Sequence, residues 1–320
     1  MRALIAALAL LLFCAAPTRA ETILVSNERD NSITVIDGAT LQVTRTVRVG
    51  RRPRGIALSQ DRRQLYICAG DDDRVEVLDL ATWRVVRHLP SGSDPELLAL
   101  HPDGRRLFVA NEDDNLVTVV DVQRGAVLSE IPVGVEPEGM GMSPDGRFLV
   151  NTSETTNMAH VIDTTTQQVV ANVPVGARPR VAVWQPDGAR FWVSSEIGGV
   201  VTVVDAQRFQ PAGTIEFRVP GVPREAVQPV GIVFAADGAR AFVALGPANR
   251  VAVVEAPALR VERYLLVGQR VWNLALSGDG RRVYTTNGVS NDLSVIDVEA
   301  NRVLRSVPVG RSPWGVVVVP

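Results

Sequence analysis

The stretch LFVANEDDNLVTVVD, residues 107–121, contains two apolar runs separated by a short polar segment. Both runs are rich in Val and other residues that favour strands, while the Asn and Asp residues between them favour a tight turn. A third apolar run precedes the stretch (LLALH, 97–101) and a fourth follows it (AVLSEIPVG, 126–134), each beyond a turn signal that contains glycine. The segment from 97 to 134 therefore predicts four consecutive strands joined by tight turns.

This four-strand unit repeats along the chain. An acidic residue closes the third strand of each unit at a spacing of 42 residues, with one spacing of 50. These residues are Asp37, Asp79, Asp121, Asp163, Asp205, Glu255 and Asp297. Turns related to PDG follow the same spacing, as does a proline near the start of each unit, which Val271 replaces once; all place one eight-residue insertion between Asp205 and Pro229. Four strands in a repeat of this length are typical of a β-propeller blade.

The two ends of the repeat array predict how the ring closes. The N-terminal part supplies only the last three strands of a unit (TILVSNE, SITVID and VTRTVRVG), and the C-terminal part supplies only a first strand, GVVVVP. Together they complete a seventh blade. We therefore predict an all-β, seven-bladed β-propeller of four-stranded blades, with its ring closed by the C-terminal strand joining the N-terminal three strands. Such closure leaves no open ring edge.

Residues 1–20, MRALIAALALLLFCAAPTRA, have the pattern of a Sec-type signal peptide. A basic start precedes an apolar run too short for a comfortable membrane span, and small residues precede the expected cleavage site. Cleavage after Ala20 would release residues 21–320 into the periplasm as one propeller domain, without a membrane span. Cys68 would then be the only cysteine, and its apolar strand sequence predicts a buried packing residue.

The composition excludes several classes of function. All 33 basic residues are arginines, set against 35 acidic residues, so the net charge is −2. The absence of lysine excludes Schiff-base and P-loop lysines, and the near-neutral charge argues against nucleic-acid binding. The three histidines (His88, His101 and His160) occupy different positions of the repeat, so we do not expect them to form one metal or catalytic cluster. No CxxCH or GxSxG motif occurs.

The repeat resembles the YVTN-type β-propeller repeat, in the segments LYICAGDDDRVEVLD (65–79), LFVANEDDNLVTVVD (107–121) and VYTTNGVSNDLSVID (283–297). With a signal peptide and seven units, the layout is similar to that of the PQQ-dependent catabolism-associated β-propeller family. Members of that family accompany alcohol oxidation dependent on pyrroloquinoline quinone and an ABC transport system. The resemblance thus implies a periplasmic accessory role and no particular reaction.

The candidate binding residues follow the repeated proline. In a propeller, the loops before first strands and those between second and third strands emerge on one face, around the channel mouth. The residues at this position are Arg54, Glu96, Glu138, Arg180, Val230, Trp272 and Trp314. Charged and aromatic members of this set could grip a ligand with a planar or apolar part beside a charged part. The alternative is a set of ion pairs and packing tryptophans around a plugged channel.

A second set of acidic residues lies in the loops between second and third strands. Asn27-Glu28, Asn111-Glu112, Ser153-Glu154 and Ser195-Glu196 share one register. Clustered oxygens can bind Ca²⁺, but this spacing matches no calcium loop, and tight turns favour Asp and Asn anyway. We therefore predict no metal site and no cofactor. The aspartates that close the third strands are expected to accept backbone hydrogen bonds in turns.

These features predict a non-enzymatic, monomeric periplasmic propeller. Its partner would be a periplasmic protein, such as a dehydrogenase or transport component, or a small organic ligand. The insertion with Pro220, Pro223 and Arg224 could be a docking loop or a solvated loop without a role. One alternative is a lactonase-type hydrolase in which Glu96 and Glu138 act as an acid–base pair. The other is a structural or surface interaction module.

Overall fold

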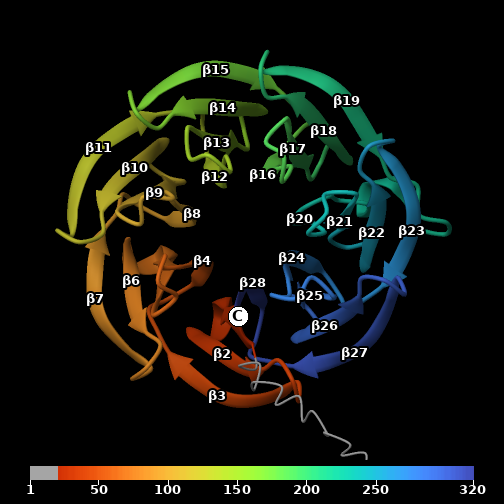
Figure 1. The fold of residues 1–320 in the computed structure, drawn as a ribbon, viewed down its shortest axis with the longest axis horizontal. Coiled ribbons are helices and arrows are strands. Elements are labelled where there is room, and N and C mark those ends of the chain that lie inside the picture. The colour runs from red at the N-terminus through yellow and green to blue at the C-terminus, as the bar shows by residue number, and fades with distance from the viewer. Residues whose placement is uncertain (1–20) are drawn as a thin grey trace, which may run out of the picture.

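The structure is a computed structural model, and it describes residues 21–320. The predicted signal peptide, residues 1–20, lies outside the described residues. Seven four-stranded antiparallel sheets stand around a central axis as the blades of a propeller (Figure 1). The predicted fold class is therefore confirmed. Within residues 21–320, no helix has the length and apolar character needed to cross a membrane.

The blades are numbered along the chain and their strands are given from the axis outward. Blade 1 contains β28 (Pro313–Val319), β1 (Thr22–Asn27), β2 (Ser32–Asp37) and β3 (Gln42–Arg48). Blade 2 contains β4 (Pro53–Leu58), β5 (Gln64–Ala69), β6 (Arg74–Asp79) and β7 (Arg84–Pro90). Blade 3 contains β8 (Pro95–Leu100), β9 (Arg106–Asn111), β10 (Leu116–Asp121) and β11 (Ala126–Pro132). Blade 4 contains β12 (Pro137–Met142), β13 (Phe148–Ser153), β14 (Met158–Asp163) and β15 (Gln168–Pro174).

The remaining blades follow the same order. Blade 5 contains β16 (Pro179–Trp184), β17 (Arg190–Ser195), β18 (Val200–Asp205) and β19 (Gln210–Glu216). Blade 6 contains β20 (Ile232–Phe234), β21 (Arg240–Ala244), β22 (Arg250–Glu255) and β23 (Arg260–Leu266). Blade 7 contains β24 (Val271–Leu276), β25 (Arg282–Asn287), β26 (Asp292–Asp297) and β27 (Arg302–Pro308). Three 3₁₀ turns lie between strands: η1 (Glu28–Asp30), η2 (Gly70–Asp72) and η3 (Arg224–Ala226).

The core lies between neighbouring blades. The second and third strands of each blade are buried almost throughout, because sheets pack against both of their faces. The outermost strands alternate between exposed and buried side chains, as β7 does, since only one face is covered. Trp192 of blade 5 packs edge to face against Phe234 of blade 6, with 4.9 Å between ring centroids. Cys68 is fully buried in such a layer, as predicted, and burial raises the pKa of its thiol.

The repeated aspartates close tight turns. The Oδ1 atom of Asp79 accepts hydrogen bonds from the backbone N–H groups of Ala81 (3.1 Å) and Thr82 (2.7 Å). Asp205 accepts the equivalent pair from Gln207 and Arg208, at 2.9 and 2.8 Å. The expected scaffold role of these aspartates is thus confirmed, and these bonds lower the pKa of both carboxyl groups.

The ring closes through one antiparallel strand pair. β28 pairs with β1 so that Val319 faces Thr22 and Val316 faces Val25, as the sequence predicted. Glu21, next to β1, reinforces the junction between blades 1 and 7. Its carboxylate accepts hydrogen bonds from the hydroxyl of Tyr284 (2.5 Å) and the N–H of Gly278 (2.9 Å).

Removal of residues 315–320 is expected to lower the free energy of unfolding by about 5 kcal/mol or more. The deletion removes most of β28, including the valines that pair with β1, each of which contributes about 1.5 kcal/mol or more when buried. Urea denaturation measures the effect. Deletion of the exposed Pro320 alone is the control, and equal stability of both truncated proteins would contradict closure by β28.

Candidate functional site

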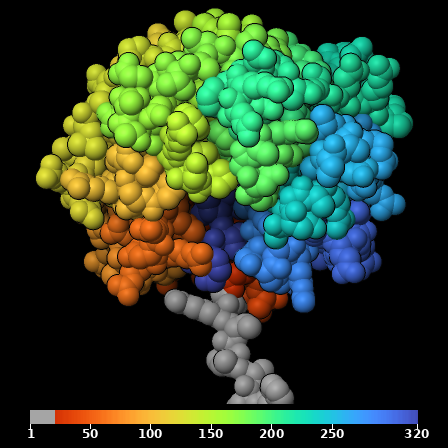
Figure 2. All heavy atoms as spheres, turned by 45° about the horizontal axis from the view of Figure 1, so that its top comes forward, coloured from red at the N-terminus to blue at the C-terminus, as the bar shows by residue number. Residues whose placement is uncertain are grey.

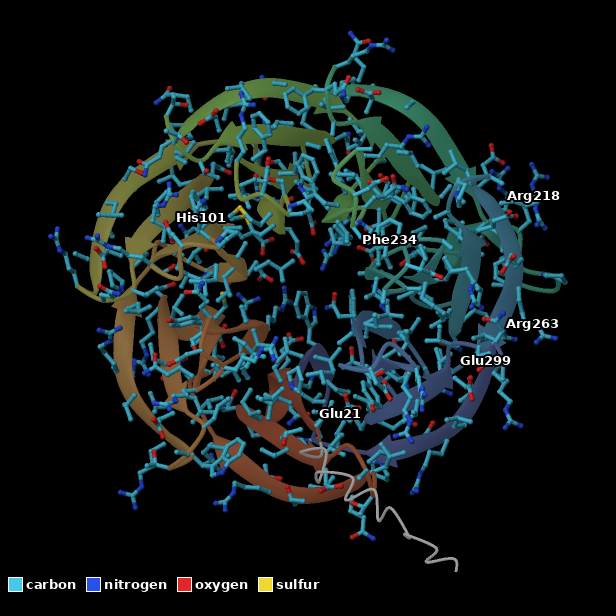
Figure 3. The ribbon with its side chains drawn as sticks, in the orientation of Figure 1. Glu21, His101, Arg218, Phe234, Arg263 and Glu299 are labelled. Atoms are coloured by element: carbon cyan, nitrogen blue, oxygen red, sulfur yellow. The ribbon has the colours of Figure 1, made fainter. Side chains whose placement is uncertain are left out.

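Two sets of loops surround one end of the channel. An inter-blade loop joins the last strand of one blade to the first strand of the next, and a hairpin loop joins the second and third strands of a blade. Their residues around the axis form what we call the mouth. The ring is hollowed at its axis, and side chains carrying nitrogen and oxygen project into the centre (Figures 2 and 3).

Repeated backbone hydrogen bonds hold the two loops together. The N–H of Glu112 donates to the carbonyl oxygen of Asp94 at 2.9 Å, and the N–H of Glu196 donates to that of Arg178 at 2.8 Å. Asn157, at the end of a hairpin loop, has φ 55° and accepts a hydrogen bond from the N–H of Arg178 at 2.9 Å. Asn tolerates this left-handed conformation better than most residues, which explains its recurrence there. These bonds fix the backbone from which the mouth side chains extend.

Glycines bring the first strands close together below the mouth. A Cβ atom on Gly55 would overlap the carbonyl oxygen of Glu96, and one on Gly139 would overlap that of Arg180. Glycine is needed at these close approaches because any side chain would push the neighbouring strand away. The residues just before these glycines, Arg54 and Glu138, therefore lie beside those of the adjoining blade.

Arg54 and Glu96 form the first ion pair of the mouth. The guanidinium of Arg54 lies 2.6 Å from a carboxylate oxygen of Glu96, which is fully buried, and 3.4 Å from Glu28. Arg52 lies 3.1 Å from the other oxygen of Glu96 and also contacts Asp94. Burial disfavours the charge on Arg54, but the surrounding carboxylates outweigh burial and raise its pKa above the ordinary value.

Arg180 is the centre of a second group of ion pairs. Its side chain is 5% exposed and lies 2.8 Å from Glu138, in contact with Glu154, and 3.8 Å from Glu196. Arg178 lies 2.7 Å from Glu154, and Arg270 lies 2.7 Å from Glu196. The group thus links blades 4, 5 and 7 across the axis.

The tryptophans at the mouth pack beside guanidinium groups. The guanidinium carbon of Arg270 is 4.4 Å from the ring centroid of Trp272, and that of Arg180 is 5.6 Å from it. The guanidinium carbon of Arg54 is 5.9 Å from the ring of Trp314, which is buried. All six predicted mouth residues therefore belong to one charged and aromatic cluster. The many ion pairs in this cluster agree with the alternative interpretation, in which these residues form ion pairs and packing tryptophans around the channel.

Sequence analysis missed Arg52, Arg178 and Arg270 as members of this cluster. Each lies one residue before the repeated proline or, in blade 7, before Val271. The residues at this position in other blades include Asp94 and Glu136, so the charge here varies from blade to blade, as it does in the predicted set. Applying the same comparison one position earlier would have found them.

Two adjoining cavities open at the mouth. One, of about 270 Å³, has ten lining residues, which include Glu112, Glu138, Arg178 and Trp272. The other, of about 390 Å³, is lined by Glu112 and Arg178 as well, together with acidic residues and the exposed Ile197. Glu112 and Arg178 therefore border both cavities. The larger cavity lies at the lower end of the range for small-molecule sites, about 300–1,000 Å³, and the smaller one lies just below it.

Two mouth carboxyl groups have raised pKa values. Burial raises the pKa of Glu112 to about 7, and the nearby carboxylates of Glu96 and Glu154 add to the effect. Burial also raises the pKa of Glu138 well above its ordinary value, although Arg180 opposes this. Glu112 can therefore hold a proton near neutral pH, unlike the turn aspartates.

Asp94, Glu96 and Glu112 place one carboxylate oxygen each within 4.8 Å of one another. Such a set has the oxygen ligands of a divalent-cation site. Arg52, however, contacts both Asp94 and Glu96. A metal ion would have to share these two carboxylates with a guanidinium group, so the set does not suit a metal.

The insertion joins β19 to β20 and lies partly at the outer rim. Phe217, Val219 and Val227 are buried in the core between blades 5 and 6. The N–H of Arg218 donates to the hydroxyl of Tyr264 at 2.8 Å, and Arg218 lies at the outside of the ring in Figure 3. Pro220, Pro223 and Arg224 are exposed, so a docking role remains a prediction.

Comparisons with known proteins extend the description of the fold. No protein-family model matches the chain, and no curated protein matches it. Among solved structures it is similar to Kuenenia stuttgartiensis hydrazine synthase, with 20% identity, a TM-score of 0.74 and coverage of 83% of this chain and 95% of that one. A functionally unknown protein from Desulfotomaculum acetoxidans DSM 771 has 15% identity, a TM-score of 0.78 and coverage of 93% and 98%. Dihydro-heme d1 dehydrogenase NirN has 18% identity, a TM-score of 0.70 and coverage of 92% and 74%. At these identities the similarity shows the fold alone.

Replacement of Arg180 by leucine is expected to lower the free energy of unfolding by about 3–5 kcal/mol. The change leaves Glu138 and Glu154 buried without this partner, and breaking a buried ion pair from one side carries a cost of this size. Arg208→Leu removes an exposed arginine from a turn and serves as the control. Similar denaturation midpoints for both variants would contradict a structural role for the Arg180 ion pairs.

Replacement of Glu112 by glutamine is expected to make stability less dependent on pH. The folded protein binds the Glu112 proton more tightly than the unfolded chain does. The stabilisation of the folded state by this proton is therefore lost as pH rises from about 4.5 to 7. Glu112→Gln should match the original protein at pH 5 and have the higher Tm at pH 8. Glu130→Gln, at an exposed position of β11, is the control. Equal Tm differences at both pH values would show that Glu112 does not titrate in this way.

Proposed function

We propose that the protein is a non-enzymatic periplasmic binding protein whose mouth receives a small polar ligand. The proposal depends most on the two adjoining cavities of about 270 and 390 Å³, which share Glu112 and Arg178. Around them, equivalent positions of different blades carry different residues. A symmetric structural role would favour one residue type in each blade, whereas recognition of one ligand favours an asymmetric set.

Binding without chemical reaction agrees with the arrangement of the charged groups. Arg54 and Arg180 are each held by several carboxylates, and Glu96 lies between Arg52 and Arg54. Groups restrained in this way are preorganised for recognition, since little side-chain freedom is lost when a ligand binds. A partner protein that covers the mouth is the other form that this proposed function can take.

The resemblance to propellers associated with PQQ-dependent catabolism gives the proposal its biological setting. We place the protein beside alcohol oxidation and the associated transport system, as a carrier or sensor of a small compound. The ligands to test first are therefore pyrroloquinoline quinone, alcohols, and the aldehydes and acids derived from them.

Thermal unfolding of the purified protein against these ligands tests the proposal. A ligand present at 100 times its Kd should stabilise the protein by about 2.7 kcal/mol, which corresponds to a Tm increase of roughly 4 °C for a chain of this size. The increase should be lost in Trp272→Ala, since Trp272 lines the smaller cavity. It should persist in Trp83→Ala, which changes a tryptophan in the turn between β6 and β7.

A Tm increase that survives in Trp272→Ala would place the ligand elsewhere and contradict binding at the mouth. If no ligand changes the Tm, the protein should instead co-purify with a periplasmic partner. Failure of both measurements would overturn the proposed function.

The lactonase alternative now has a specific candidate residue. Glu112 borders both cavities, and its pKa of about 7 suits a general base at neutral pH. Hydrolysis of a panel of lactones by the purified protein, lost in Glu112→Gln and in Glu138→Gln, would support an enzyme. Rates no higher than those in buffer would exclude hydrolysis of the tested lactones.

A further inference from the structure

We propose that a cavity between blades 3 and 4 is a second binding site, which takes an uncharged carbonyl compound with a small apolar body. The cavity has a volume of about 420 Å³, within the range of small-molecule sites. It shares no lining residue with the two cavities of the mouth. The inference therefore goes beyond the proposed function and does not depend on it.

The cavity opens between the inter-blade loop after β11 and the outer half of blade 4, which β14 and β15 form (Figure 1). Its apolar wall consists of Pro132, Val133, Met158 and Val169. None of its lining residues carries a carboxylate or a guanidinium group, whereas both mouth cavities and a cavity of about 490 Å³ between blades 5 and 6 contain such groups. An ion placed here would lose water without gaining an opposite charge, so the cavity favours an uncharged ligand.

His160 is the buried polar residue of this cavity, with 7% of its surface exposed. Its Nε2 atom accepts a hydrogen bond from the N–H of Gly134 at 3.0 Å. The ring proton must therefore be on Nδ1, which donates to Oδ1 of Asn172 at 2.6 Å. Burial lowers the pKa of His160, although the bond to Asn172 opposes this. The ring thus stays neutral at pH 7 and adds no charge to the cavity.

The bond to His160 also determines which part of Asn172 can meet a ligand. Because Oδ1 of Asn172 accepts the imidazole proton, the NH₂ group is the part that remains available. Asn172 and Thr156 both line the cavity and are exposed to solvent. An amide NH₂ group can only donate, and a hydroxyl group can donate as well. A carbonyl oxygen has two lone pairs, so it can accept from both residues at once.

The position of Thr156 in the repeat supports its availability. In four other blades, the residue at this position accepts a hydrogen bond from a backbone N–H of the neighbouring inter-blade loop, at 2.5–2.8 Å. These residues are Asp30, Asp72, Asp114 and Ser290. Among residues 21–320, no such bond reaches Thr156. Its hydroxyl group is therefore free to bind a ligand.

The position of Met158 in the repeat explains why the wall is apolar. In blade 2 the corresponding residue is Arg74, whose guanidinium lies 2.7 Å from the carboxylate of Glu76. In blade 7 it is Asp292, which accepts a hydrogen bond from Asn287 at 2.5 Å. Blade 4 has a thioether where these blades have charged groups held by polar partners. Methionine sulfur also packs favourably against aromatic rings, so an aromatic body suits this wall.

The methionine methyl groups provide a direct test. NMR spectra of protein labelled with ¹³C at these methyl groups report on Met158, which lines the cavity, and on Met140 and Met142, which do not. Titration with acetophenone should shift the Met158 signal, identified by its loss in Met158→Leu, and leave the other two unchanged. The Kd for acetophenone should be at least tenfold lower than that for benzoate or benzylammonium, which are of similar size but charged.

Two variants test recognition of the carbonyl group. Asn172→Asp keeps an oxygen for His160 but replaces the NH₂ donor with a carboxylate oxygen, so the Kd for acetophenone should increase at least tenfold. Gln123→Glu makes the same chemical change at an exposed turn of blade 3 and should leave the Kd unchanged. Thr156→Val removes only a hydroxyl group at an exposed position and should increase the Kd about threefold or more.

Trp272→Ala separates this site from the mouth. The shift of the Met158 signal should persist in this variant, and its loss would assign the effect to the mouth and overturn a second site. Benzoate or benzylammonium binding as tight as that of acetophenone would refute selection of an uncharged ligand. An unchanged Kd in both Asn172→Asp and Thr156→Val would refute recognition of the carbonyl group. If no probe shifts the Met158 signal, the inference is wrong, whereas the Tm measurements test ligands of the mouth separately.

Discussion

The hydrogen-bonded ladder between β28 and β1 is the constraint on which the rest of the structure depends. Each blade buries its faces against two neighbours, so an open ring would leave two blades half covered. Closure also fixes the distance across the axis. Only then do side chains from blades that are far apart in sequence, such as Arg180 of blade 5 and Trp272 of blade 7, come into contact. The arrangement of side chains at the mouth therefore depends on ring closure.

The mouth combines a high energetic cost with geometric precision. Removing charges such as those of Glu96 and Arg180 from water is unfavourable, and ion pairing returns only part of this cost. Arginine suits the task because its planar guanidinium can contact several carboxylates at once, as Arg180 contacts Glu138 and Glu154. A hydrophobic plug would close a channel at lower cost. The retention of a charged mouth, with Glu112 unpaired by arginine within the described residues, is easier to understand if recognition depends on it.

The fold could be predicted from the sequence because each blade carries the same local information. The turn aspartates, the spacing of 42 residues and the division of blade 1 between the two ends of the array can each be read from the repeat, and the structure confirms them. The mouth was predicted only in part. Repeat position showed that Arg54 and Glu96 face the axis, but pairing across blades depends on side-chain length and direction. Repeat position therefore did not reveal that Arg52 joins Glu96, or that Glu112 stays without an arginine partner.

The position of β28 in the chain also has a consequence for biosynthesis. β1 leaves the ribosome before the strands of blades 2 to 7, but its partner at the axis is complete only when residue 319 has been added. A nascent chain can therefore form blades 2 to 7 while the inner edge of blade 1 is still unpaired. Until β28 has been synthesised, that edge can pair with other extended segments. Closure of the ring must accordingly follow the synthesis of β28, and a chaperone that covers β1 would protect the chain in the interval.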